Sequence, residues 1–272
     1  QLGNETTENV MTIIYDLSKV PANIVEQIHA SPKYTKWFSE FPTKLFNRDN
    51  NAKTVKGLKL GTSTLVMYLL PSNLSGYQVC AAEVLAQCGG PCLNTAGRGA
   101  MSSVQMSRLR KTLMFFQYRA EFLDMIQTEV RAHVKYCAKH EYEAACRPNG
   151  TSDIRWELYM WDFMVEMHKL GVQWYDYTKL ANRLVPDENV YDLTFSYSGV
   201  DTYKKSVDTA RALGMRMAVV WRYQTSIPKT FMGMDVVSGD DDDLTYLSPR
   251  GVVRALYAKG KAVRDTSGFV LN

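Results

Sequence analysis

The segment that decides the fold is Thr64-Leu-Val-Met-Tyr-Leu-Leu70, an apolar run that ends sharply at Pro71. A short run of this kind, bounded by residues that break regular structure, is typical of a buried strand. A cysteine loop follows, with three of the chain's five cysteines inside thirteen residues: Cys80, Cys88 and Cys92. A glycine-bracketed turn, Gly97-Arg98-Gly99, then leads into a long helical pattern. The unit is therefore strand, cysteine loop, turn and helix.

Composition narrows the class of protein. The chain has 272 residues, of which 46% are hydrophobic, so it is long enough to bury a sizeable core as one domain. A formal net charge of +4 permits a nucleic-acid partner without requiring one. No apolar run approaches the roughly 20 residues of a membrane span, so we expect a soluble protein without a membrane partner. An odd number of clustered cysteines favours reduced thiols in a cytoplasm over a disulfide framework.

The segment from Ser103 to His140 contains no Gly or Pro, and its apolar residues recur every three to four positions. This pattern predicts one long amphipathic helix or two abutting ones. We expect the other side to be exposed, as a solvated face or a track for nucleic acid. It carries six basic residues: Arg108, Arg110, Lys111, Arg119, Arg131 and Lys135.

Six further strands are predicted, at residues 142–147, 172–176, 191–197, 217–222, 234–237 and 252–257. Helical segments separate several of them, at residues 156–169, 177–183 and 201–213. This alternation is typical of βα units and a parallel sheet. We predict an α/β fold that forms a complete or partial (β/α) barrel, with a doubly wound open sheet as the alternative. Residues 1–61 form an N-terminal extension or cap in this scheme, and residues 62–272 form the barrel-like domain.

A barrel gathers the polar residues that follow its strands at one mouth. Asp153, Asp176 and Lys179 occupy such positions and are the candidate acid–base or positioning groups. Asp153 has the simpler alternative of capping a helix. The three aspartates Asp153, Asp176 and Asp240 form an alternative site for magnesium. Candidate residues for binding an anionic or polar substrate are Asn94, Arg98, Arg147, Asn149 and Arg222.

The cysteine loop has three interpretations. Three thiolates that follow the first strand leave one iron of an iron–sulfur cluster open, and this order of elements resembles radical S-adenosylmethionine enzymes. That resemblance implies S-adenosylmethionine as a cofactor, although those enzymes typically have three and two residues between their cysteines, and this loop has seven and three. Zinc is the second interpretation, with a fourth ligand from Cys137, Cys146 or a histidine. The third is inert core thiols.

The sharpest charge run is Gly239-Asp-Asp-Asp-Asp243. Four adjacent carboxylates repel one another unless they are solvated or bound to a cation. We expect an exposed acidic loop, with a divalent metal site as the alternative.

Several motifs together resemble a family of bacteriophage proteins related to gene product 88-like proteins. The resemblance spans residues 51–270 and is carried by Cys92-Leu-Asn-Thr-Ala-Gly-Arg-Gly99, Asn149-Gly-Thr-Ser-Asp153, Tyr175-Asp-Tyr-Thr-Lys179 and the ending 259–269. It implies a phage-encoded protein that acts in the cytoplasm of the infected bacterium. It implies no activity.

Two hypotheses of function follow. In the first, the chain is an iron–sulfur enzyme that acts on a nucleotide, a nucleic acid or a host metabolite. In the second, it is a zinc-stabilised or metal-free module that binds nucleic acid or a host protein, using the basic helix face.

Overall fold

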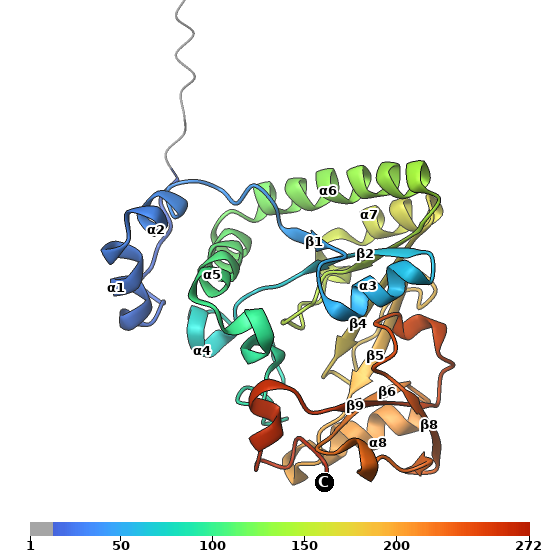
Figure 1. The fold of residues 1–272 in the computed structure, drawn as a ribbon. Coiled ribbons are helices and arrows are strands. Elements are labelled where there is room, and N and C mark those ends of the chain that lie inside the picture. Colours follow the sequence, from blue (N-terminus) through green and yellow to red (C-terminus); the bar gives the residue numbers. More distant parts are fainter. Residues whose placement is uncertain (1–12) are drawn as a thin grey trace, which may run out of the picture.

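The computed structural model describes residues 13–272, so residues 1–12 of the predicted N-terminal extension lie outside the described residues. The chain forms a mixed α/β fold around one nine-stranded sheet (Figure 1). The strands are β1 (Phe46–Arg48), β2 (Thr62–Met67), β3 (Glu143–Arg147), β4 (Val172–Thr178), β5 (Tyr191–Ser196), β6 (Met217–Trp221), β7 (Thr230–Phe231), β8 (Met234–Ser238) and β9 (Val253–Tyr257). All seven predicted strands are present.

The helices are α1 (Ala22–Ala30), α2 (Pro32–Trp37), α3 (Ala52–Lys59), α4 (Ser72–Ser75), α5 (Ser102–Gln117), α6 (Arg119–His140), α7 (Glu157–Lys169) and α8 (Lys204–Ala212). Six short 3₁₀ turns complete the structure: η1 (Leu93–Thr95), η2 (Gly97–Ala100), η3 (Asp201–Tyr203), η4 (Gln224–Ser226), η5 (Thr245–Leu247) and η6 (Gly260–Arg264). The long helical pattern is confirmed as two abutting helices, which separate at the non-helical Tyr118. The prediction of a short helix at 177–183 is wrong, because contacts with Asp153 and Glu157 hold this segment in an irregular turn.

The sheet order is β1-β2-β3-β4-β5-β6-β9-β8-β7. Strands β2 to β6 are parallel and adjacent in chain order, and β9 pairs in parallel with β6. Strand β8 lies beyond β9 and is parallel to it, so the chain order turns back at β9. The antiparallel strand β1 lies at one edge and the β7–β8 hairpin at the other. This pairing establishes an open sheet of the α/β class, and the complete or partial barrel stays a prediction.

The two faces of the sheet differ in chemistry, since successive side chains of a strand point to opposite sides. Cys146 and Trp174 point into the main apolar core, where Trp174 Nε1 donates to the carbonyl of Met164 in α7 at 3.0 Å. Their neighbours Ala145 and Tyr175 point the other way and pack on Leu244. Because Arg147 and Arg254 belong to this second side of the sheet, we call it the polar face.

Residues before β2 contribute to the sheet as well as to the predicted cap. Helices α1 and α2 pack against each other at one end of the molecule (Figure 1). Strand β1 pairs with β2, and α3 packs on β2, so the sheet begins upstream of residue 62. Among residues 13–272, no helix combines the length and the apolar character that crossing a bilayer requires.

Gly150 lies where the chain leaves β3, against the end of β2. Its N–H donates to the carbonyl of Met67 at 2.7 Å. A Cβ atom at this position would lie 2.6 Å from that oxygen and 2.5 Å from the Tyr68 ring. Only glycine allows this approach, so it brings the segment 149–157 beside the start of the cysteine loop.

Candidate functional site

The cysteine loop, residues 77–92, crosses the carboxyl ends of the parallel strands and is tied to segments that follow three of them. The carbonyl of Val79 accepts from the Asp153 N–H at 2.7 Å, after β3. The carbonyl of Ala86 accepts from the Ser198 hydroxyl at 2.8 Å, after β5. The carbonyl of Gln87 accepts from Ser267 after β9. The loop is therefore held over the edge of the sheet that the sequence predicts to carry the site.

The five cysteines fall into two groups, and all five are reduced thiols. Cys80, Cys88 and Cys92 are half-buried at this edge, whereas Cys137 and Cys146 are buried in the core. Cys137 Sγ lies 3.5 Å from His133 Nε2 on the same helix. The clustered cysteines of the sequence are thus separated in space from the other two, which cannot supply a fourth ligand to the loop without unfolding the core.

The three loop thiols lie close enough to influence one another's ionisation. Burial raises the pKa of Cys80, and the charges of Asp153, Cys92 and Cys88 raise it further. Burial is also the main cause that raises the pKa values of the Cys88 and Cys92 thiols. The three thiols therefore influence one another electrostatically, and their convergence as metal ligands stays a prediction.

Lys179 faces this group of thiols from the turn after β4. Burial lowers the pKa of Lys179 to about 8, while Cys88, Asp153, Cys80 and Cys92 act in the opposite direction. Its Nζ donates to the carbonyls of Ser196 at 3.0 Å and Tyr197 at 3.2 Å, and lies 4.4 Å from the centre of the Phe269 ring. The ammonium of Lys179 is therefore half-buried, and its charge lowers the pKa of the Cys88 thiol against the effect of burial.

Within the described part of the chain, no group of three or more His, Cys, Asp or Glu side chains is arranged to hold a metal ion. The three thiols share a region without forming a closed ligand set. The predicted magnesium site is not formed either, because Asp153 and Asp176 have protein partners and Asp240 lies among lysines.

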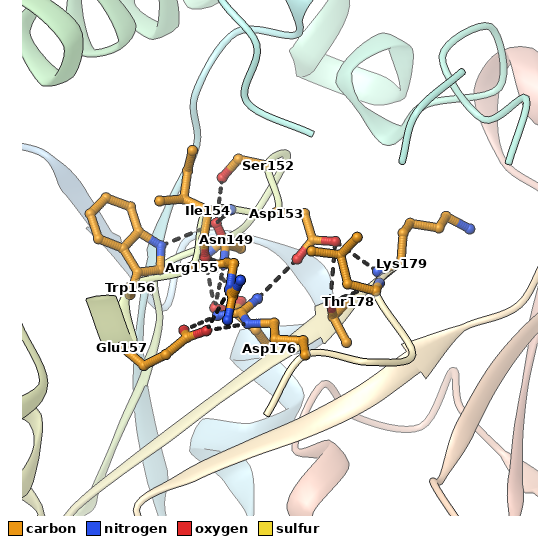
Figure 2. Close-up of polar contacts among 12 residues, drawn as sticks. Asn149, Ser152, Asp153, Ile154, Arg155, Trp156, Glu157, Asp176, Thr178 and Lys179 are labelled. Atoms are coloured by element: carbon orange, nitrogen blue, oxygen red, sulfur yellow. Dashed lines mark hydrogen bonds and ion pairs between the residues drawn. The ribbon is translucent and has the colours of Figure 1, made fainter. Parts of the chain in front are cut away.

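The candidate acid–base residues Asp153 and Asp176 belong to a buried polar network (Figure 2). Asp153 accepts from the Lys179 N–H at 2.7 Å, from Thr178 at 3.2 Å and from Arg183 at 2.9 Å. The side chain of Lys179 extends away from these contacts (Figure 2). The contacts of Asp153 are those of a group that fixes the 179–183 turn, and its predicted catalytic role stays a prediction.

Asp176 is completely buried in β4 and accepts from both the backbone and the side chain of Asn149 at about 3.0 Å. The Tyr191 hydroxyl donates to it at 2.6 Å. Burial raises the pKa of Asp176 to about 7, against the lowering influence of Arg147 and Tyr191. Its acid–base role likewise stays a prediction, since these protein groups surround the carboxylate.

Arg183 joins the network and was not among the predicted site residues. Its side chain is fully buried and pairs with Asp153 at 2.9 Å and with Glu157 at 2.7 Å. It also donates to Tyr191 at 3.2 Å. The sequence offers no periodic signal for this role, because Arg183 and its partners lie 26 and 30 residues apart.

Of the five predicted substrate-binding residues, Arg147 and Asn149 meet at the carboxylate of Asp176, whereas Asn94 and Arg222 contact other segments. The Asn149 side-chain carbonyl accepts from Ser152, Ile154 and Trp156, which folds the segment after β3 around it. Arg222 donates to the carbonyls of Val263 and Asp265 and so holds the C-terminal segment. Both residues therefore have structural contacts.

Two further members of that set, Asn94 and Arg98, follow the cysteine loop in the chain, and the fifth, Arg147, ends β3. Asn94 is buried and accepts from the guanidinium of Arg108, which also lies 4.9 Å from the Tyr68 ring. Arg98 is exposed on η2. Asn94 thus fixes the exit of the cysteine loop, while Arg98 remains accessible to a partner.

The acidic run is not the exposed loop that the sequence suggests. Asp243 is buried on the polar face, where it pairs with Arg147 at 2.8 Å and accepts from Tyr175. Asp242 pairs with Arg254 at 3.1 Å. Asp240 pairs with Lys259 at 2.7 Å and with Lys53 at 3.4 Å. The run repels less than expected because the chain itself supplies the cations.

The prediction of an exposed basic face on the long helical segment is wrong for three of its six residues. Arg108, Arg110 and Lys111 are buried. Arg110 donates to the carbonyls of Glu40 and Phe41, and Lys111 donates to that of Leu45 at 2.7 Å. These three cations satisfy backbone or side-chain acceptors inside the fold, so they are not available to a nucleic acid.

Comparison with known proteins identifies the family. A family model described as gene product 88 matches residues 43–272. The chain belongs to the gene product 88 family. This membership confirms the predicted phage gene-product resemblance. No curated protein and no solved structure matches the chain, so the resemblance to radical S-adenosylmethionine enzymes gains no support from known folds.

Proposed function

We propose that this gene product 88 protein is a metal-dependent enzyme in which Cys80, Cys88 and Cys92 bind an iron–sulfur cluster. The observation that carries the proposal is that a loop with three cysteines crosses the carboxyl edge of a parallel sheet, where Cys88 packs on the cluster of Phe269, whose ring centre lies 4.4 Å from Lys179 Nζ. Active sites of α/β proteins lie at this edge. As predicted from its family, such an enzyme would act in the cytoplasm of the infected bacterium.

The donor chemistry fits such a cluster. Thiolates are soft ligands that select iron–sulfur clusters, copper(I) or zinc, and three of them leave one position open. Because the thiols do not form a closed ligand set in this structure, binding requires the loop to draw them together. The segment Gly89-Gly90-Pro91 lies between two of the cysteines, and the space where Gly90 would carry a Cβ atom is open. The loop therefore has space to change its conformation at Gly90.

The residues of the chain would support the bound group in definite ways. Metal binding deprotonates thiols, so it adds negative charge to this partly buried region. The ammonium of Lys179 is positioned to offset that charge. Asp153 holds the backbone of both Lys179 and Val79, so it positions the two sides of the site relative to each other. A bound cluster would supply one-electron chemistry and an open coordination position.

Metal analysis of anaerobically purified protein tests the proposal. We expect iron and sulfide in the wild-type chain, with absorbance at the blue edge of the visible range. Cys80→Ser, Cys88→Ser and Cys92→Ser should each lose most of the iron, because thiolate ligands are not replaced by hydroxyls. Cys137→Ser is the matched control and should keep it, since its sulfur lies in the core beside His133.

The same measurement separates the alternatives. Zinc that is lost in the three loop variants would replace the enzyme proposal with a zinc-stabilised module. Iron that survives all three substitutions would overturn the proposal outright. The nucleic-acid module keeps only half of its proposed basic face, because three of the six basic residues on the helices are buried.

A further inference from the structure

An open cleft of about 540 Å³ lies on the outer side of the cysteine loop. One wall is formed by the loop itself, including Gln87, Gly89 and Gly90. The opposite wall is the C-terminal segment, including Lys261, Arg264 and Thr266. This volume is within the range of about 300–1,000 Å³ that is usual for small-molecule sites.

The charges of the cleft are unevenly engaged. Its two carboxylates are used by the protein: Glu83 accepts from Ser72 at 2.7 Å, and Asp265 accepts from Ser267 at 2.7 Å and from the Val270 N–H at 3.0 Å. Within residues 13–272, the side chains of Lys261 and Arg264 form no ion pair or hydrogen bond. The cleft therefore presents two uncommitted cations to a ligand.

The walls also suit close approach by a polar group. Gly89 and Gly90 offer backbone without side chains, and nothing lies within 4 Å of a Cβ atom placed on Gly90. The Ser267 hydroxyl donates to Gln87 at 3.3 Å, so the two walls are joined at one end. An arginine, a lysine and open backbone together form a pattern that recognises phosphate oxygens.

We infer that this cleft binds the phosphate group of a nucleotide or of a nucleic-acid strand. The inference deepens the proposed function by naming a substrate class, and the role of the ligand as substrate rests on that proposed function. The cleft and the thiols share one loop, because Gln87 and Gly89 line the cleft and Cys88 lies between them in the chain. A ligand in the cleft would therefore contact the backbone that carries the proposed metal ligand.

Binding is measured on the full metal-free chain, with pyrophosphate, a nucleoside diphosphate, a single-stranded DNA oligonucleotide and succinate as probes. We expect binding of at least one phosphate probe. Lys261→Ala/Arg264→Ala should weaken it about tenfold or more, since two charge-assisted contacts are lost. Gly90→Phe should weaken it similarly by filling the open space. Lys139→Ala/Lys205→Ala, which removes two exposed cations from α6 and α8, should leave it unchanged.

The outcomes are distinguishable. Binding of the diphosphate assigns a nucleotide, whereas binding of the oligonucleotide alone, with a steep dependence on salt, assigns a nucleic acid. Equal binding of succinate and pyrophosphate would overturn the phosphate assignment. So would the absence of all binding, or binding that both cleft variants retain. Iron content is measured separately, so the cleft and the metal site can fail independently.

Discussion

The acidic run 240–243 and the cysteine loop 77–92 both place like groups close together in the sequence, yet these groups have different partners in the fold. Asp240, Asp242 and Asp243 each pair with a cation of the chain. The loop thiols instead act electrostatically on one another and on the half-buried Lys179. Crowded groups whose partners are supplied by the fold contribute to structure, whereas crowded groups that face one another at the edge of a sheet are candidates for function.

The largest expected effect comes from breaking the acidic run's principal ion pair. Arg147→Met should lower the free energy of unfolding by about 3–5 kcal/mol, because it leaves the carboxylate of Asp243 buried without its cation. Both side chains are less than a tenth exposed. Urea denaturation measures the change. Arg131→Met removes an exposed pair with Glu166 and should change stability little. Equal effects of the two variants would show that the buried pair is not structural.

A pH series tests the network beside this pair. The pKa of Asp176 is about 7 in the folded chain, above the ordinary 3.8 of an aspartate. The folded chain therefore binds more protons than the unfolded chain between these values, so stability falls as the pH rises from about 4 to about 7.

Asp176→Asn cannot ionise and should remove that fall, an effect on the order of 2 kcal/mol. The exposed Asp162→Asn variant should keep the wild-type slope. Denaturation midpoints at several pH values measure both. If the slope is the same in wild type and Asp176→Asn, the buried carboxylate does not titrate in this range.

A pair of glycines compares the tight contact of Gly150 at the end of β2 with the open backbone of the cysteine loop. Gly150→Ala should cost about 1–3 kcal/mol, because its Cβ atom would overlap the Met67 carbonyl and the Tyr68 ring. Gly90→Ala enters open space in the cysteine loop and should change stability by less than about 1 kcal/mol. Thermal denaturation compares them. A large loss of stability in Gly90→Ala would mean that the loop around Gly90 is packed as tightly as the backbone around Gly150.

The smallest expected effect concerns the thiols themselves. In the metal-free chain, Cys88→Ser should change the free energy of unfolding by less than about 1 kcal/mol, since the site is half-buried. Cys146→Ser should cost about 1–3 kcal/mol, because its hydroxyl would be buried in the apolar core. Guanidinium denaturation measures both. Comparable losses would assign the loop cysteines a packing role and remove the contrast with the acidic run.

Most of the fold was within reach of the sequence. The run 64–70, the βα alternation and the helical spacing of 103–140 predict the strands and the long helices, because burial of apolar side chains imposes a period on the chain. The segment 177–183 was mispredicted as a helix, because its local pattern is helical. In the structure Asp153 accepts from the Lys179 N–H and Glu157 pairs with Arg183, and these contacts hold the segment in a turn. For the candidate site, the sequence proposed the cysteines and Lys179, whose roles stay predictions, and gave no sign of Arg183 or of the cleft.

The sequence by itself determined which residues alternate between the faces of each strand and which glycines allow the chain to turn, because these follow from local geometry. Only the tertiary structure decided that Arg108, Arg110 and Lys111 are buried and that the acidic run is neutralised, because their partners come from distant segments. It also placed the cysteine loop over the carboxyl edge of the sheet. Charge and coordination depend on distances in space, and spacing along the chain does not fix those distances.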